Sequence, residues 1–296
     1  MLKTMAVEIV ALRDKIESRA STPAEELRFT RLVEEMKGMV VAKESQESGP
    51  EFRELIDREK EKLKEFFGEE IEVPPLPSEI TPKRYEEWKE KGLELHYLPP
   101  VEMKEDSDFP GWEKKPGKRH TPHAQWGIEF FDAIKNGDLP ADAATLSGAW
   151  TLIDTRRKPQ YNSANQRYED DPLGPVLEAL RKKNFIADFK VKGSRYDISP
   201  EEFEKPEVRA ALAEALGIPV EALHLPRAID YNYIGNAFYP EWGETDTYEW
   251  FEDVYKGQHR LYGGDSDGGG LSHVSWIGAA SRYASIGFRP LGRFSH

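Results

Sequence analysis

Three stretches near the C-terminal end decide the fold: LHLPRAIDY at residues 223–231, TYEWFED at 247–253, and RLYGGD at 260–265, which leads to IGFRP at 286–290. The first stretch predicts a strand that passes through proline into a short helix. From Gly217 onward the chain has short segments rich in Gly, Trp and Tyr, with no long periodic apolar run. Such a pattern predicts small twisted strands joined by ordered loops.

The residue types in these stretches suit a core that is short of long helices. Trp250 is large and flat enough to fill such a core. We expect Arg289, on the terminal stretch, to pair with Glu249 or Asp253. Close backbone approach or a positive φ where strands bend is expected at three glycines: Gly263, Gly264 and Gly287.

The N-terminal part of the chain is expected to be mainly helical. Residues 22–25, Thr-Pro-Ala-Glu, have the pattern of a capping box with proline at the first helical position. Apolar residues then recur at three- and four-residue spacing as far as Val40. A second helix is expected from Glu51 to Phe67, with Gly68 as its stop. These two helices predict a hairpin, which either packs on its own chain or pairs with another subunit to form a homo-oligomer.

The amino-acid composition of the next segment is different. Residues 72–80 are extended and proline-rich, a short helix begins after Thr81, and residues 99–122 form an irregular linker with five prolines. We therefore predict a mainly helical region with a proline-rich linker over residues 1–120 and a compact domain over 121–296. In the second region we expect a strand at 149–153 and helices that begin near Asp171, at Ser199 and at Pro206. The predicted fold class is α+β, with small twisted antiparallel sheets flanked by two helices.

Composition narrows the classes of partner. The chain has 41 basic and 54 acidic residues, a net charge of −13, which argues against a nucleic-acid partner and against docking on an anionic membrane. Charged residues interrupt the first 20 positions, so we expect neither a secretory signal nor a membrane span. The chain has no cysteine, which excludes disulfides, thiolate metal sites and thiol nucleophiles.

Taken in order, the C-terminal stretches resemble the pattern of the formylglycine-generating-enzyme branch of the C-type lectin fold. In that branch an RLP strand and helix precede a W-E-W strand, an R-x-x-x-G-G segment and a terminal GFR. The likeness covers residues 145–294. His224 stands where the branch has arginine, Tyr248 replaces the first tryptophan, and Arg260 lies one residue closer to its glycine pair. The resemblance implies a C-type lectin-like fold.

The known chemistry of that branch requires residues that this chain lacks. Formylglycine-generating enzymes use paired cysteines, and related sulfoxide synthases hold iron through a His-x3-His-x-Glu helix. The close histidine pair here, His120 and His123, has a different spacing and a proline between. The calcium triplets of sugar-binding lectins are also missing, and we expect the carboxylates of Asp265 and Asp267 to cap backbone amides. We therefore predict no catalytic residue, no metal site and no cofactor.

The composition changes sharply after Gln258. Residues 259–296 contain no Lys, Glu, Gln or Met. One explanation is a glycine-rich β core with little room for long side chains. The other is a resemblance to the variable proteins of diversity-generating retroelements, in which randomised adenines of AAY codons give Tyr, Ser, Asp, Gly, His, Ala, Asn or Arg. By that resemblance residues 260–290 form a variable region, and its diversified ligand-binding positions are Tyr262, Gly268, Ser272, His273, Ser275, Ala279, Ala280, Ser281 and Ala284.

The resemblance also separates display positions from scaffold. Because a randomised position must tolerate Asp, Gly and Tyr alike, Tyr262, His273, Ser275 and residues 279–281 should point outward. Apolar neighbours should point inward, namely Leu261, Val274, Ile286 and Phe288. Trp276 cannot arise from such a codon and is assigned to the scaffold or to a fixed contact. The expected scaffold is Trp250, Gly263, Gly264, Trp276, Gly287, Phe288 and Arg289.

The function implied by the resemblance is ligand or receptor binding through the C-terminal variable face. The ligand would be a protein or a surface, and the chain would not be an enzyme. The same resemblance implies a place on a virion, such as a phage, or on a cell surface. Two alternatives stay open: an enzyme of the formylglycine-generating kind with altered chemistry, and a structural virion or surface protein.

Overall fold

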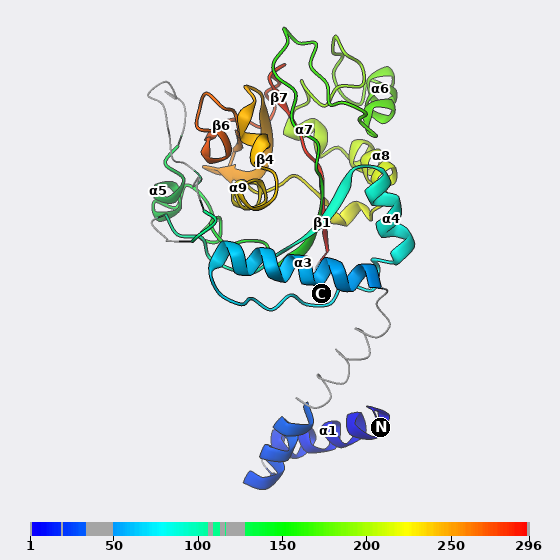
Figure 1. Ribbon diagram of the computed structural model, residues 1–296, viewed down its shortest axis with the longest axis vertical. Coiled ribbons are helices and arrows are strands. Elements are labelled where there is room, and N and C mark those ends of the chain that lie inside the picture. Colours follow the sequence, from blue (N-terminus) through cyan, green and yellow to red (C-terminus); the bar gives the residue numbers. More distant parts are fainter. Residues whose placement is uncertain are drawn as a thin grey trace. The chain divides into compact units, whose positions relative to one another are not determined.

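The computed structural model describes residues 2–18, 20–33, 50–105, 109–112, 116 and 128–294 (Figure 1). The chain divides into two compact units. The first comprises Met1–Arg58 with Pro74–Leu76, and the second comprises Glu59–Val73 with Pro77–His296. Helix α3 (Pro50–Phe67) contributes residues to both.

The first unit begins with a helical hairpin, made of α1 (Leu2–Glu17) and a helix over residues 23–33. The capping box predicted at Thr22 is present. The backbone N–H of Glu25 donates to Thr22 Oγ1 at 3.3 Å, and the backbone N–H of Thr22 donates to Glu25 Oε2 at 2.8 Å. Ion pairs join the two helices, Lys15 with Glu25 at 2.7 Å and Arg28 with Glu8 at 2.5 Å. The part of the first predicted helix beyond residue 33, as far as Val40, lies outside the described residues.

The first sheet of the second unit is four-stranded, in the order β1-β2-β8-β3, and every neighbouring pair is antiparallel. Its strands are β1 (Leu93–Leu98), β2 (Ala149–Asp154), β8 (Leu291–Phe294) and β3 (Leu223–His224). All six residues of β2 are buried, as expected for a central strand covered on both faces. The last strand of the chain thus lies beside the strand that was expected at 149–153.

The second sheet has the order β6-β5-β4-β7. Its strands are β4 (Tyr248–Tyr255), β5 (His259–Gly263), β6 (Val274–Gly278) and β7 (Ile286–Gly287). The pair β4 with β7 is parallel and the other pairs are antiparallel. The register of β4 against β5 shifts between Trp250 and Val254, an irregularity that bends a sheet locally.

Helices cover these sheets (Figure 1). They are α4 (Pro82–Glu90), α5 (Phe130–Lys135), α6 (Gly174–Lys182), α7 (Pro200–Phe203), α8 (Pro206–Leu216) and α9 (Ala228–Ala237), with short 3-10 turns η1 (Val220–Ala222), η2 (Pro240–Glu244) and η3 (Gly270–Ser272). Helix α9 packs on the second sheet, where Tyr231 lies 5.2 Å from Phe251 between ring centroids. Trp88 of α4 donates to the backbone oxygen of Leu216 at 2.9 Å and ties α4 to α8.

Sequence signals placed the helix ends correctly. Thr81 caps α4, and Ser199 with Glu202 forms the predicted capping box of α7. Gly217 adopts a left-handed conformation, φ +70° and ψ 38°, and ends α8 as predicted. The helix expected near Asp171 begins at Gly174, because Asp171 Oδ1 accepts a hydrogen bond from the backbone N–H of Leu173 before the first turn.

Two expectations differ from the structure. The sequence placed a single boundary at 120/121, but β1 pairs along its whole length with β2, so the second unit begins well before residue 121. The α+β class is confirmed, but more than two helices flank the strands, and the pair β4 with β7 is parallel although antiparallel sheets were expected. Sequence patterning missed the role of β1 because a strand's partner is chosen by distant residues. Among the described residues no helix is long and apolar enough to cross a membrane.

Candidate binding surface

A buried ion pair forms the centre of the frame behind the C-terminal stretches. Arg289 Nε donates to Glu249 Oε2 at 3.0 Å, and both side chains are fully excluded from solvent. Arg289 also donates to the backbone oxygen of Asp154, at the end of β2. Its guanidinium lies 4.0 Å from the ring centroid of Trp242. The predicted pairing of Arg289 with Glu249 is confirmed, and it ties the two sheets together.

A second buried group of charges extends this frame. Arg195 Nη2 lies 2.5 Å from Asp154 Oδ2 and 2.6 Å from Asp171 Oδ1. Burial alone would raise the pKa of Asp154, but the guanidinium groups of Arg195, Arg289 and Arg156 outweigh it and hold that pKa below its usual value. The carboxylate is therefore ionised over the physiological range and acts as a structural partner.

Lys158 fastens the end of β5 to the start of β4. Its Nζ donates to the backbone oxygen of Thr247 at 2.8 Å and to that of Gly264 at 2.5 Å. Burial lowers the pKa of this amine to about 8. Gly264 has φ +89°, and an added Cβ would lie 2.7 Å from Tyr231 Oη. The predicted need for glycine at 264 is confirmed. Lys158, which holds this turn, was not identified from the sequence.

The other predicted scaffold residues are buried, with one exception. Trp250 is 1% exposed and donates from Nε1 to the backbone oxygen of Ile198 at 2.9 Å. A Cβ on Gly263 would overlap the backbone oxygen of His273, and one on Gly287 would lie 3.1 Å from the ring of Tyr196. Phe288 is buried as expected.

Trp276, which the sequence assigned to the scaffold or to a fixed contact, is 37% exposed. It lies on β6, the edge strand, where its ring meets His259 at 4.5 Å and Tyr255 at 5.4 Å between centroids. At an edge strand the side chain has no neighbouring strand on one side to cover it. Trp276 is therefore a surface aromatic residue that is only partly buried.

Three aromatic rings meet at the solvent edge of the second sheet. Tyr248 of β4 and Tyr262 of β5 are half-buried, and their ring centroids lie 5.4 Å apart at an interplanar angle of 75°. The ring of His273 lies 5.7 Å from Tyr248 and 6.3 Å from Tyr262. Burial, then the nearby carboxylate of Asp265, raise the pKa of Tyr248. Its hydroxyl therefore stays protonated and can donate hydrogen bonds.

Beyond β6 the chain forms an exposed loop. Tyr283 is 47% exposed, and Ala280 and Arg282 are exposed as well. The backbone oxygen of Ala279 accepts from the N–H of Glu201 at 3.2 Å, and that of Tyr283 accepts from the N–H of Asp197 at 3.3 Å. These bonds fix the main chain of residues 279–285, in which Ala280, Arg282 and Tyr283 are exposed and the other side chains are half-buried.

The predicted display positions divide into two groups. Ala280 is exposed and Tyr262, Ala279, Ser281 and Ala284 are half-buried, so these five reach solvent. The other four are buried: Gly268, Ser272, His273 and Ser275. The expectation that His273 and Ser275 point outward is therefore wrong, whereas the inward placement of Leu261, Val274, Ile286 and Phe288 is confirmed.

The reason is the path of residues 264–273, which fold back beneath the strand ends. Asp265 Oδ2 accepts from the backbone N–H of Gly268 at 2.9 Å, and its Oδ1 contacts His273 Nδ1. A Cβ on Gly268 would lie 2.6 Å from the His273 ring. Ser275 faces Tyr262 in the register of β6 with β5 and is 1% exposed. The amide-capping role expected of Asp265 is confirmed.

Two aromatic residues of this surface were not among the predicted positions. Tyr248 was interpreted as the replacement of a scaffold tryptophan, and Tyr283 was treated only as part of a motif. Since Tyr248 lies two residues from the buried Trp250 on one strand, the alternation of a strand places both on the same face. That signal could have placed Tyr248 beside Tyr262, whereas the exposure of Tyr283 depends on tertiary structure.

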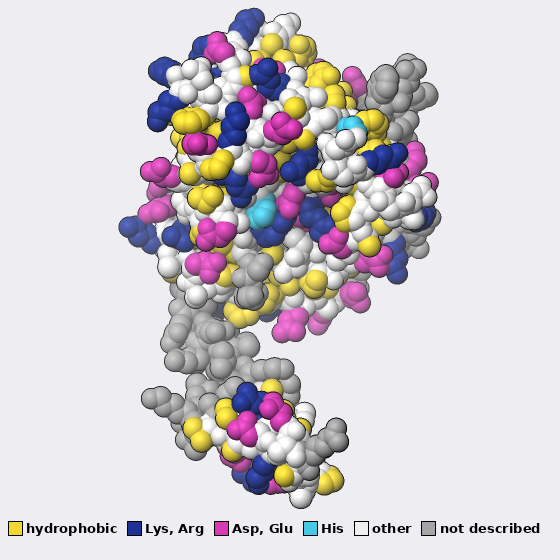
Figure 2. All heavy atoms as spheres, turned by 180° about the vertical axis from the view of Figure 1, so that it is seen from behind, with side chains coloured by type: hydrophobic (Ala, Val, Ile, Leu, Met, Phe, Trp, Pro, Cys, Tyr) yellow, Lys and Arg dark blue, Asp and Glu magenta, His cyan; other side chains and the backbone are white. Residues whose placement is uncertain are grey.

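No site for a metal ion can be assembled from the residues that the structure describes, since no three of their His, Asp and Glu side chains gather in ligand geometry. His120 and His123 lie outside those residues. Figure 2 shows basic and acidic side chains interleaved on the visible face, with no extended basic area.

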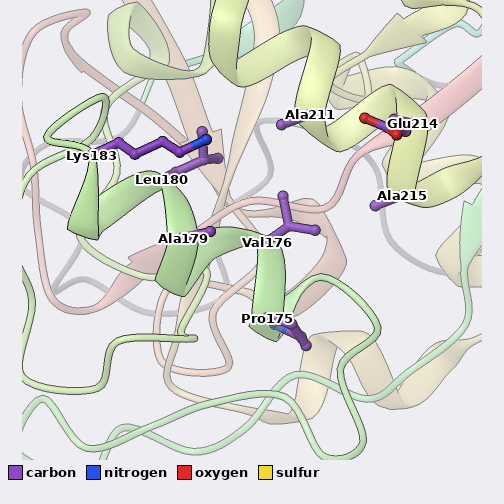
Figure 3. Close-up of a pocket in the computed structure, with 8 residues that line it drawn as sticks. All are labelled: Pro175, Val176, Ala179, Leu180, Lys183, Ala211, Glu214 and Ala215. Carbon is purple, nitrogen blue, oxygen red and sulfur yellow. The ribbon is translucent and has the colours of Figure 1, made fainter.

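A separate hollow of about 430 Å³ lies between α6 and α8 (Figure 3). Small apolar side chains of the two helices face each other across it, including Val176, Ala179, Ala211 and Ala215, with Lys183 and Glu214 at its margin. Lys183 and Glu214 are the titratable side chains among the residues that line it. Comparison of the chain with protein-family models, with curated proteins and with solved structures gave no match.

Proposed function

We propose that the chain is a ligand-binding protein, and that its second unit is a C-type lectin-like domain that displays a diversified surface, as in the variable proteins of diversity-generating retroelements. The observation that carries the proposal is the loop 279–285, whose main chain is anchored by hydrogen bonds from the backbone N–H groups of Asp197 and Glu201 while residues 280, 282 and 283 are exposed. Rigid frames with adaptable surface residues are the usual architecture of binding sites.

The position of the tyrosines supports the same function. Tyr248, Tyr262 and Tyr283 combine large contact area with few rotatable bonds and a hydroxyl that can donate or accept. Near them stand small residues, Ala279, Ala280 and Ser281, of which Ala280 is exposed and the other two are half-buried. Ala284 is also half-buried, but it packs against the buried rings of Tyr168, Phe189 and Tyr196. The display surface is therefore defined as these seven residues, Tyr248, Tyr262, Ala279, Ala280, Ser281, Tyr283 and Ala284.

The buried ion pairs behind this surface should let the fold accept substitutions at the display residues. Arg289 with Glu249 and Arg195 with Asp154 are fully inside the frame, so substitutions at 279–284 leave these pairs intact. Randomising an exposed position costs little stability, whereas randomising a buried one opens cavities or buries unpaired polar groups.

A paired library tests the proposal without a known ligand. One library randomises Ala279, Ala280, Ser281 and Tyr283. The matched library randomises the buried Gly268, Ser272, His273 and Ser275. The first should yield mostly folded, protease-resistant proteins from which binders to immobilised test proteins can be selected, and the second mostly unfolded ones. Equal loss of folding in both libraries, or no selectable binders from the first, would count against a display surface.

A genomic observation tests the diversification itself. Under the proposal, DNA near the gene carries a near-copy of the segment for residues 260–290 that differs at adenines, close to a reverse transcriptase gene. The differing codons should cluster at the display residues within that segment, from Tyr262 to Ala284, and spare those of Gly263, Gly287 and Arg289. Absence of such a copy would restrict the function to binding without diversification.

A further inference from the structure

The rings of Tyr248, Tyr262 and His273 meet at steep angles. The ring planes are inclined by 75° between Tyr248 and Tyr262, by 60° between Tyr248 and His273, and by 81° between Tyr262 and His273. The corresponding distances between ring centroids are 5.4, 5.7 and 6.3 Å. No two of these rings are stacked, so none covers the face of another with its own face. We call these three residues the aromatic corner.

The aromatic corner is held from the core side and reaches solvent on the other. His273 is buried and contacts Asp265. Tyr262 lies against the buried Trp250, with ring centroids 5.8 Å apart and an angle of 73°. Tyr248 and Tyr262 are only half-buried. The rings are therefore positioned by the frame before any ligand arrives, which lowers the entropic cost of binding.

Carboxylates stand beside these rings. Asp265 and Asp267 both raise the pKa of Tyr248, and Asp265 also raises that of Tyr262, because a nearby negative charge disfavours the phenolate. Asp265 is buried and Asp267 is exposed. The amine of Lys158 is buried, and its hydrogen bonds go to two backbone oxygens behind the turn. The negative charge at the aromatic corner is thus available to a group that comes from solvent.

This combination favours a positively charged ligand group. The face of an aromatic ring attracts a cation that lies within about 6 Å of its centroid. The carboxylates of Asp265 and Asp267 add attraction of the same kind, whereas an anion would be repelled. Lysine and arginine side chains carry their charge on an aliphatic stem, which can lie along the rings.

We propose that the aromatic corner, together with Asp265 and Asp267, receives a lysine or arginine side chain of the protein ligand. This inference rests on the proposed ligand-binding function and names the chemistry that the surface recognises. Tyr248 lies outside residues 260–290, so one ring of the site stays fixed when that segment varies. The preference for a basic side chain would then be shared by different versions of the surface.

NMR titration of the full chain with small compounds tests the proposal. The probes are N-acetyl-lysinamide and N-acetyl-argininamide, and the neutral control is N-acetyl-norleucinamide, which has an aliphatic side chain without the ammonium group. At millimolar concentration at least one cationic compound should shift the resonances of residues 248, 262 and 273. Its Kd should be lower than that of the neutral control by about 5-fold or more. Equal binding of all three compounds, or no binding of either cation, would overturn the proposal.

Substitutions separate the contribution of the rings from that of general charge. Tyr262→Leu should weaken binding of the cationic compound about 5-fold or more, while Tyr262→Phe keeps the ring and most of the affinity. Asp267→Asn should weaken it about 2- to 5-fold, and the matched control at an exposed carboxylate, Asp142→Asn, should leave it unchanged. Equal losses from the leucine and phenylalanine variants, or from the two asparagine variants, would contradict the site.

Two further comparisons keep the test decisive. Urea denaturation shows whether each variant folds, and Asp267→Asn, at an exposed residue, still tests the site if Tyr262→Leu does not fold. The library at Ala279, Ala280, Ser281 and Tyr283 leaves the aromatic corner unchanged. If that library yields binders while neither cationic compound binds, the ligand chemistry proposed here is wrong and the display surface stands. If a cationic compound binds but the library yields no binders, the display function fails and the cation site stands.

Discussion

The Nε of Arg289 lies 3.0 Å from Oε2 of Glu249, and neither side chain has any solvent-exposed surface. Glu249 belongs to β4 of the second sheet, while Arg289 also reaches the end of β2 in the first. Burial works against the charge, yet Glu249, Tyr168 and Asp154 raise the pKa of Arg289 above its ordinary value. Arg289 therefore links the two sheets through its contacts with Glu249 of β4 and Asp154 of β2.

Loss of the arginine should destabilise the second unit strongly. Arg289→Met leaves the Glu249 carboxylate buried without its partner, and removal of one member of a buried pair costs about 3–5 kcal/mol. Urea denaturation followed by tryptophan fluorescence measures the change. The surface pair Lys182 with Glu178, 3.0 Å apart, is the control, and Lys182→Met should cost less than about 1 kcal/mol. Adding Glu249→Met to Arg289→Met should recover part of the loss; equal effects for the buried and surface pairs would contradict this role.

Glycine 263 should not accept even one methyl group. The Cβ of Gly263→Ala would overlap the backbone oxygen of His273, and backbone cannot move aside cheaply. We expect a loss of about 1–3 kcal/mol or more. At Gly278 of the neighbouring strand an added Cβ meets only Ser281 Oγ at 3.5 Å, an ordinary contact. Gly278→Ala should change the free energy of unfolding by less than about 1 kcal/mol. Thermal denaturation of both variants measures the difference. Similar melting temperatures would show that an added Cβ at position 263 does not clash with the backbone oxygen of His273.

Asp253 should make stability depend on pH. Burial raises its pKa from 3.8 to about 6, although its Oδ2 accepts a hydrogen bond from the backbone N–H of Ala228. Between about pH 4 and 6 the folded state keeps a proton that the unfolded state has lost. The free energy of unfolding therefore falls as pH rises through this window, by up to about 3 kcal/mol from this group.

The variant Asp253→Asn tests this sign because it cannot ionise. Relative to the wild type it should gain stability as the pH rises from about 4 to above 6, measured by denaturation at each pH. Asp142→Asn, at an exposed carboxylate, is the control and should show no such trend. A relative stability of Asp253→Asn that stays constant or falls with pH would show that the buried carboxyl does not titrate in this way.

Lys158 should be needed for the turn after β5. Lys158→Met removes the donor shared by the backbone oxygens of Thr247 and Gly264 and leaves two buried acceptors unpaired. We expect a loss of about 2–3 kcal/mol. The same substitution at the exposed Lys183 should be nearly neutral. Hydrogen exchange is the more specific measurement, since the backbone amides of residues 264–273 should lose protection in the variant before those of the sheets do. Unchanged protection of these amides would show that Lys158 does not hold the turn.

The local elements were largely predictable from sequence. The caps at Thr22, Thr81 and Ser199 depend on residues within three positions of each other, so short patterns suffice. The strand at 149–153 and the helix over 206–216 likewise follow from runs of neighbouring residues. The pairing of β1 with β2 was not predictable in this way, because it joins residues about 55 positions apart through hydrogen bonds that any strand can make.

The candidate surface was predictable only in part. Composition drew attention to residues 260–290, and five of the nine expected display positions do reach solvent. Ser275 and Trp276 show the limit of such reasoning. A codon argument placed the serine outside and assigned the tryptophan to the scaffold or to a fixed contact. The serine is 1% exposed, whereas the tryptophan is 37% exposed. Burial at an edge strand depends on which loops cross it.

The sequence by itself determined the α+β composition, most helix ends, and the need for Trp250 and the glycines, because side-chain size and backbone freedom act through residue type. It narrowed the partner of Arg289 to Glu249 or Asp253, and the structure shows Glu249. Only the tertiary structure decided which residues face solvent. Residues 264–273 fold back so that Asp265 meets His273, and the three expected display positions in this segment, Gly268, Ser272 and His273, are buried. Ala280, in the loop 279–285, is exposed. Exposure is a property of the whole packed chain, since each side chain is covered by residues far from it in sequence.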